Sequence, residues 1–142
     1  MMLPFKKCLL FCSLLWIIPS WKQSKTLTLT IEVNGLSNSK GNVHVGLYRK
    51  QDDFPDIKGT FKNKIQLASE KKLVFENLPQ GNYAVAVFHD LNKNGKMDTN
   101  LFGVPTEKYG FSNNARSTFS APDFEDAAFN LSENRKISIT IK

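Results

Sequence analysis

Apolar and polar residues alternate along the first half of the chain with the two-residue period of β-strands. The segment 26–33 reads TLTLTIEV, so its leucine, isoleucine and valine side chains all fall on one face. The segment 43–48 repeats the pattern, with valines and a leucine facing inward and His44 facing outward as a surface residue. Because strict alternation over four to eight residues is typical of half-buried strands, both segments are predicted as strands. The turn residues between them favour a hairpin that pairs the two strands.

Five further segments have strand character: 65–67, a short edge strand, and 73–78, 83–89, 125–131 and 137–141. The segment 83–89 carries apolar side chains on both faces, which is typical of a central strand. No helical period is found after the first 24 residues. We therefore predict an all-β fold for residues 25–142, a single antiparallel β-sandwich of the immunoglobulin-like or transthyretin-like kind, with six to seven strands and one long loop. Its expected core consists of Leu27, Leu29, Ile31, Val43, Val45, Leu47, Phe75, Val85, Val87, Phe129, Ile137 and Ile139.

Residues 1–24 are typical of an export signal. Two lysines, Lys6 and Lys7, precede an apolar run over 8–18 that is broken by Pro19. The run is shorter than the roughly 20 residues that a membrane-spanning helix needs, so no transmembrane span is expected in the mature chain. We predict cleavage and a periplasmic or secreted product, and an uncleaved anchor is the alternative. Both cysteines lie within this segment, so the mature chain has no thiol for a disulfide or a metal.

The positive charge does not indicate a nucleic-acid partner. The formal net charge is +6, and it falls to +4 without Lys6 and Lys7 at the start of the signal segment. The remaining lysines are scattered, without a basic block or a known reading motif, which argues against nucleic-acid binding. Solvated surface lysines explain this charge.

The most informative polar stretch is the run DLNKNGKMD from Asp90 to Asp98. Oxygen-bearing side chains occupy alternate positions, and Gly95 then permits a sharp turn. Such spacing is typical of loops that bind Ca²⁺, a cation that takes six to eight oxygen ligands. The run predicts a weak calcium site whose ligands are the side chains of Asp90, Asn92, Asn94 and Asp98, the carbonyl of Lys96 and the carboxylate of Glu107.

The match to a helix-loop-helix calcium site is incomplete. The twelfth position is Leu101, where such sites require a bidentate Glu, so this is not an EF-hand. Glu107 is the candidate to replace the missing ligand by folding back from the long loop. The alternatives are a plain tight turn stabilised by Asx side chains and a Glu107 that is solvated or paired with Arg116.

A long connection between Asp90 and Asp123 has little strand character but several aromatic residues. Loops of this length in a compact domain are usually functional or mobile. Part of it predicts a polar, aromatic-lined patch for a sugar or a peptide, formed by Tyr109, Phe111, Ser112, Asn113, Asn114 and Arg116. The alternative is a turn whose Ser and Asn side chains bond to nearby backbone.

The pattern HDxNxNGxxDTN at 89–100, followed by GxPxExYGFSNNA at 103–115, resembles a bacterial family of exported proteins known only as domain of unknown function 2141. The resemblance covers nearly the whole mature chain and implies no established activity. The passage FxNLPxGxY at 75–83 is similar to Cna-B-type and carboxypeptidase-regulatory β-sandwiches. Some surface proteins with such sandwiches bind calcium through loops like the one at 90–98.

Two classes of function follow. The first is an exported, non-enzymatic binding or accessory module of the cell envelope, whose partner is an envelope protein, a peptide or a carbohydrate. The second is a small metal-dependent hydrolase that uses the same loop, with His89 or Glu107 as the base. A Ser-His-Asp triad is disfavoured because His89 and Asp90, adjacent on a strand, point to opposite faces. We expect His89 to cap the core or to bond a loop carbonyl, and we favour the binding module.

Overall fold

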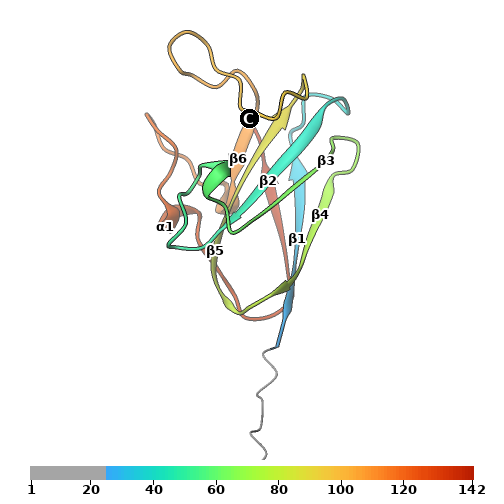
Figure 1. The fold of residues 1–142 in the computed structure, drawn as a ribbon, viewed down its shortest axis with the longest axis vertical. Helices are drawn as coiled ribbons and strands as arrows, with labels where there is room; N and C mark the ends of the chain where they lie inside the picture. Colours follow the sequence, from blue (N-terminus) through green and yellow to red (C-terminus); the bar gives the residue numbers. More distant parts are fainter. Residues whose placement is uncertain (1–24) are drawn as a thin grey trace, which may run out of the picture.

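A computed structural model describes residues 25–142, and the predicted export signal lies outside the described residues. The chain forms two sheets that face each other (Figure 1). The first sheet has the strand order β4-β1-β8, and the second has the order β3-β2-β5-β6, with β7 paired to one end of β5. The strands are β1 (Leu27–Asn34), β2 (Asn42–Tyr48), β3 (Lys62–Leu67), β4 (Lys72–Leu78), β5 (Gly81–Asp90), β6 (Tyr109–Phe111), β7 (Phe129–Leu131) and β8 (Arg135–Thr140). The predicted all-β sandwich is confirmed.

One hydrophobic core fills the space between the sheets. Eleven of the twelve predicted core residues are buried, and Ile137 is half-buried at the core's margin. The other buried members of this core are Val33, Ala68, Leu73, Leu78, Tyr83, Leu131 and Ile141. Successive side chains of a strand point to opposite faces of the sheet. A strand with one buried face therefore alternates apolar and polar residues, and this alternation is visible in the sequence.

The predicted hairpin between the first two strands is wrong. β1 pairs with β4 and, in parallel, with β8, whereas β2 pairs with β3 and β5 in the opposite sheet. Alternation shows which face of a strand is buried but not which strand lies beside it. Because the apolar faces of β1 and β2 meet across the core, the turn residues 35–41 connect two layers and not two neighbours in one layer.

Two further expectations differ from the structure. The segment 125–131 is not one strand, since a single helical turn, α1 (Phe124–Ala127), precedes the short β7. Ala127 is fully buried in that turn, and an apolar residue at this spacing suits a helical turn as well as a strand. The long connection contains β6, whose three residues extend the second sheet beyond β5.

The second sheet is apolar on its outer face as well. Ala84, Phe111 and Ala127 form a small second cluster there, bordered by Phe54 and Phe124 from the covering segments. His44, which was expected to face solvent, and Tyr48 are consequently buried, with 4% and 0% of their surface exposed. The prediction of a surface His44 is therefore wrong, because this face is covered by α1, by the long connection and by the loop that follows β2.

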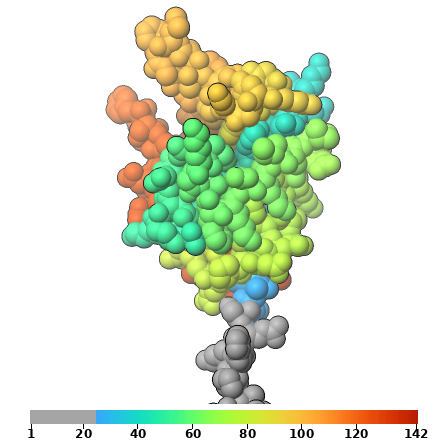
Figure 2. Space-filling view, in the orientation of Figure 1, coloured from blue at the N-terminus to red at the C-terminus, as the bar shows by residue number. Residues whose placement is uncertain are grey.

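The segment from Leu91 to Lys108 leaves the sheet at the end opposite to the start of β1 (Figure 1). Its part around residue 100, orange in Figure 2, stands above the rest of the surface. Short 3-10 turns at Ile57–Gly59 and Ser112–Asn114 complete the fold. The structure describes no helix long and apolar enough to cross a membrane within residues 25–142.

Candidate functional site

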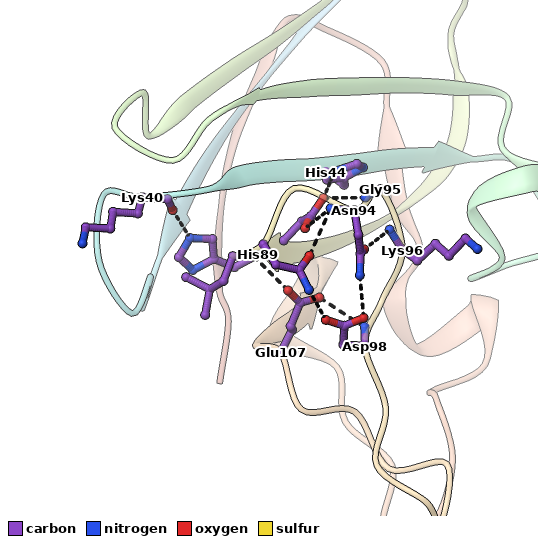
Figure 3. A network of polar contacts seen from close by, with 11 residues as sticks. Lys40, His44, His89, Asn94, Gly95, Lys96, Asp98 and Glu107 are labelled. Carbon is purple, nitrogen blue, oxygen red and sulfur yellow. Dashed lines mark hydrogen bonds and ion pairs between the residues drawn. The ribbon is translucent and has the colours of Figure 1, made fainter.

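Asp90 is the last residue of β5, and it organises the loop that follows. Its carboxylate is fully buried and accepts hydrogen bonds from the backbone N–H of Asn94 at 3.1 Å and of Gly95 at 2.9 Å (Figure 3). The same carboxylate lies 3.0 Å from Nε2 of His44 on β2. Gly95 has a φ of +77°, a conformation that glycine adopts without strain. The D-x-N-x-N-G spacing thus folds the loop back over its own first residue.

Asn92, Asn94 and Asp98 form the outer part of this network. Oδ1 of Asn92 accepts from the backbone N–H of Asn94, and Oδ1 of Asn94 accepts from that of Lys96. The two amide groups donate to the carboxylate of Asp98, at 2.6 Å from Asn92 and 2.7 Å from Asn94. The backbone bonds are Asx turns, the local geometry expected where such residues repeat at every second position.

Glu107 returns to the same loop from the far side of the long connection. Its Oε1 accepts from the backbone N–H of Leu91 at 2.8 Å, and its Oε2 accepts from that of Asp98 at 3.2 Å. Only 7% of its surface is exposed. Glu107 therefore joins both ends of the run 91–98 through backbone N–H groups. Its carboxylate is not paired with Arg116, whose guanidinium donates to the carbonyls of Tyr109 and Thr140.

The environment of Asp90 favours its charged form. Burial acts to raise the pKa of Asp90, but the N–H groups of Gly95 and Asn94, together with His44, outweigh burial and hold the pKa below its usual value. The network thus keeps a buried negative charge at the base of the loop. A carboxylate in this state is suited to orient backbone dipoles or to face a cation.

The five side chains among the predicted calcium ligands lie in one network, to which Lys96 contributes its backbone N–H, but their carboxylates are not grouped. Within residues 25–142, no three Asp, Glu, His or Cys side chains are arranged so that they could hold one metal ion together. A cation here would need the amide oxygens of Asn92 and Asn94 as well. In the present geometry these two amides turn their NH₂ groups toward the carboxylate of Asp98.

An apolar cavity of about 330 Å³ lies on the outer face of the second sheet, beside this loop. Tyr48 on β2, Ala86 and Phe88 on β5, and Tyr109 and Phe111 on β6 line its sheet side. Met97 and Pro105 from the long connection, and Pro55 and Ile57 from the loop after β2, close its sides. Ala86 gives the floor of the cavity little side-chain volume, whereas the space over its register partner Gly46 is filled by the side chains of Tyr48 and Thr60.

The predicted sugar or peptide patch is divided by the structure. Tyr109 and Phe111 line the cavity, whereas Ser112 is buried and bonds to Val85 N–H and to the Ala127 carbonyl. The amide of Asn113 donates to the carbonyls of Asp126 and Ala128, and Asn114 accepts from Thr140 N–H. These polar side chains and Arg116 fasten η2 (Ser112–Asn114) and its surroundings to α1 and β8.

His89 serves the fold. Its ring is fully buried, and Nε2 lies 2.7 Å from the carbonyl of Lys40. The expectation that it bonds a loop carbonyl is confirmed, and the bond fixes the turn before β2 to the end of β5. Neither this buried ring nor the carboxylate of Glu107, already bonded to two N–H groups, adjoins the apolar cavity.

Sequence reasoning missed the cavity residues Tyr48, Ala86, Phe88 and Met97. The two-sided apolar pattern of β5 indicated that its outer face is covered. The hollow in that cover lies over Ala86, and its walls come from β2, β6 and loops that are distant in sequence, which the pattern of β5 does not specify.

Comparison with known proteins gives a family and no activity. No curated protein matches the chain, and no solved structure matches it. A family model described as an uncharacterized protein conserved in bacteria, DUF2141, matches residues 31–139, which include both sheets, the loop after Asp90 and the walls of the cavity. The chain therefore belongs to the bacterial family DUF2141.

Proposed function

We propose that this protein is an exported, non-enzymatic binding module of the cell envelope whose ligand site is the apolar cavity on the second sheet. The observation that carries the proposal is the composition of the cavity, which is walled by aromatic and aliphatic side chains from three strands and two loops. Ligand sites are concave and mostly apolar with few polar groups, and this cavity has that character. Asp56 is its single ionisable carboxylate.

The chemistry of the cavity favours an apolar group over a sugar. The Tyr48 hydroxyl already donates to the Pro55 carbonyl at 2.8 Å, and Asp56 accepts from the backbone of Lys58. A carbohydrate needs several free hydrogen-bonding partners, whereas an apolar side chain of a peptide or an envelope protein needs none. Of the three partner classes that the sequence suggests, a peptide or protein segment with an exposed apolar side chain therefore fits best.

The loop after Asp90 is proposed to hold one wall of the cavity in place, with Ca²⁺ as the ordering ion. Met97 and Pro105 both line the cavity. Each lies within two residues of Asp98 or Glu107, which are joined by the hydrogen bond from the Asp98 N–H to the Glu107 carboxylate. In this proposal Ca²⁺ replaces the two amide groups that donate to Asp98, and the amides of Asn92 and Asn94 rotate to offer their oxygens. With so few carboxylates, the dissociation constant should lie near the 10⁻⁴ to 10⁻³ M of extracellular modules. The competing hypothesis is that hydrogen bonds alone, without a metal ion, hold the loop in shape.

The metal-dependent hydrolase receives no such support. Hydrolysis at a bound metal needs an open coordination position and a base within reach of it. His89 is buried against Lys40, and both oxygens of Glu107 are bonded to backbone N–H groups. No geometry of the described residues favours this second class.

A neutral apolar dye such as Nile red tests the cavity. Ala86→Leu fills the floor and should lower dye affinity about tenfold, since several methylene groups would occupy the ligand's place. Ser39→Leu adds the same side chain to an exposed turn and serves as the matched control. Equal dye binding by Ala86→Leu and the unmodified protein would refute the cavity as a binding site.

Thermal melts in calcium and in chelator test the loop. Asp98→Asn is the suitable variant, because Asp90 is buried and bonded, so that its replacement alone would disturb the metal-free loop. Calcium at about 100 times its dissociation constant should stabilise the unmodified protein by about 2.7 kcal/mol and the variant by much less. The side-chain amide signals of Asn92 and Asn94 should shift in the same titration. Identical melts across millimolar calcium would leave the hydrogen-bonded turn as the explanation.

Export is a separate part of the proposal. A cleaved signal would leave a product that begins near residues 21–26, and N-terminal sequencing of exported protein measures this directly. Recovery of Met1 in a membrane fraction would instead support the uncleaved anchor.

A further inference from the structure

The tip of the long connection, residues 99–106, presents apolar side chains directly to solvent. Leu101 is 101% exposed, Phe102 90% and Val104 55%. Large apolar residues scattered singly on a surface are ordinary, but three within four positions at a projecting point are not. Figure 2 shows this tip in orange, standing clear of the body of the protein. From this we propose that the tip inserts into the headgroup region of an anionic lipid surface.

Four backbone N–H groups of the tip are bonded within it. The side chain of Asn100 accepts from the N–H groups of Phe102 at 2.9 Å and of Val104 at 3.1 Å. The backbone adds bonds from Asn100 N–H to the Val104 carbonyl and from Gly103 N–H to the Asn100 carbonyl. Unsatisfied backbone donors are costly in an apolar medium, so these four internal bonds lower the cost of moving the tip out of water.

The tip is also held in a defined shape before it meets a partner. Thr99 and Pro105 form a β-bridge across its base, and Thr106 N–H donates to the Asp98 carbonyl at 2.8 Å. Asp98 belongs to the network of the preceding loop. The apolar side chains are therefore presented on a pre-ordered hairpin, which lowers the entropy that insertion would otherwise cost.

The distribution of charge favours a lipid surface over a protein pocket. Residues 99–106 contain no charged side chain, whereas Lys93 and Lys96, both exposed, precede the tip in the loop that supports it. The side chain of Lys96 extends away from the hydrogen-bond network (Figure 3). Apolar residues at a point with lysines behind them match a bilayer interface, where acyl chains lie beneath negative headgroups.

Tryptophan fluorescence gives a direct test, because both tryptophans, Trp16 and Trp21, lie in the predicted signal segment. The chain from residue 25 onward holds both sheets and no tryptophan, so Phe102→Trp is a unique reporter at the tip. With vesicles of phosphatidylcholine and phosphatidylglycerol, its emission should shift to the blue and be quenched by brominated acyl chains. An unchanged spectrum would overturn the proposal and leave a protein pocket as the partner of the tip.

Phe119 provides the matched control, since it is an equally exposed phenylalanine, at 99%, on a different loop. Phe102→Ser should reduce co-sedimentation with these vesicles about tenfold or more, while Phe119→Ser should stay within about twofold of the unmodified chain. Equal losses in both variants would indicate unspecific adsorption and refute a specific tip.

The lysines are tested by vesicle composition. The pair Lys93→Gln and Lys96→Gln should weaken binding to vesicles with phosphatidylglycerol, by about fivefold for each lysine, and leave binding to pure phosphatidylcholine unchanged. An equal loss of binding on both kinds of vesicle would refute the proposed attraction between these lysines and anionic headgroups. The cavity assay with Nile red should be unaffected by the Phe102→Ser substitution, so failure of the tip and failure of the cavity are distinguishable.

Discussion

At the scale of single residues, Tyr48 connects the second sheet to the loop that covers it. Its hydroxyl donates to the Pro55 carbonyl at 2.8 Å, and its ring meets Phe54 edge to face at 5.1 Å. The side chain is fully buried beside the cavity. Burial raises the pKa of Tyr48 well above its usual range, and the negative charge of Asp56 adds to this.

This raised pKa predicts a loss of stability at alkaline pH. The unfolded chain releases the phenolic proton near pH 10, whereas the folded protein retains it, so the stabilising contribution is complete below about pH 10 and is lost as the pH rises further. Between pH 10 and 11, the unmodified protein should lose about 1 kcal/mol more of its unfolding free energy than Tyr48→Phe does. Urea unfolding at several pH values measures the difference.

Tyr48→Phe also has an expected effect at neutral pH, where it should cost about 1 kcal/mol for the bond to Pro55. Tyr83→Phe is a useful companion, because burial raises the pKa of Tyr83 although nearby Arg49 opposes it. If Tyr48→Phe and the unmodified protein lost stability in parallel above pH 10, Tyr48 would not be the group responsible.

At the scale of elements, β3 and β4 are the edge strands on one side of the sandwich. Long polar side chains cross between them: Lys62 and Lys64 donate to the carbonyls of Glu76 and Val74, and Gln66 donates to those of Glu70 and Lys72. Unpaired edges are templates for pairing with other chains, and lysines on an edge strand oppose this. These side chains thus occupy backbone acceptors that an incoming strand would use.

Removing two of them should promote association through this edge. Lys64→Ala combined with Gln66→Ala leaves the carbonyls of Val74, Glu70 and Lys72 open to another strand. Size-exclusion chromatography at rising concentration should then detect dimers or larger species. Lys58→Ala combined with Gln80→Ala changes the same residue types at exposed positions outside β3 and β4 and should remain like the unmodified protein. Indistinguishable elution of the two double variants would contradict this account of the edge.

At the scale of the whole molecule, the two sheets share one core and should unfold together. Ile31, on the central strand of the first sheet, is 0% exposed and belongs to this core. Ile31→Ala should lower the free energy of unfolding by about 2–5 kcal/mol, because it removes buried methyl groups and leaves a cavity. Ile65→Ala, on the edge strand with 58% exposure, should change it by about 0.5 kcal/mol or less.

Urea unfolding of both variants, followed by circular dichroism and by tyrosine fluorescence, provides the measurement. The two signals should change in one coincident transition, since the inner face of each sheet is buried only against the other sheet. Two separated transitions would mean that the sheets are independently stable.

The fold class followed from local pattern, whereas the partners of each strand did not. Alternation at 26–33 correctly predicted that Leu27, Leu29 and Ile31 are buried. It carried no information on pairing, and the expected hairpin with the next strand was wrong because those two strands lie in opposite sheets. The parallel pairing of β1 with β8 joins segments about one hundred residues apart, which no short-range signal specifies.

The sequence by itself determined the loop after Asp90, because Asx turns and a glycine turn are formed by residues only two to five positions apart. Tertiary structure alone decided the rest. It buried His44 against Asp90, brought Glu107 back to Leu91, and left a cavity over Ala86 between β6 and the covering loops. Local hydrogen bonds depend on residues that are neighbours in the chain. Burial and cavities depend on which distant segments pack together, and this is decided only when the sandwich forms.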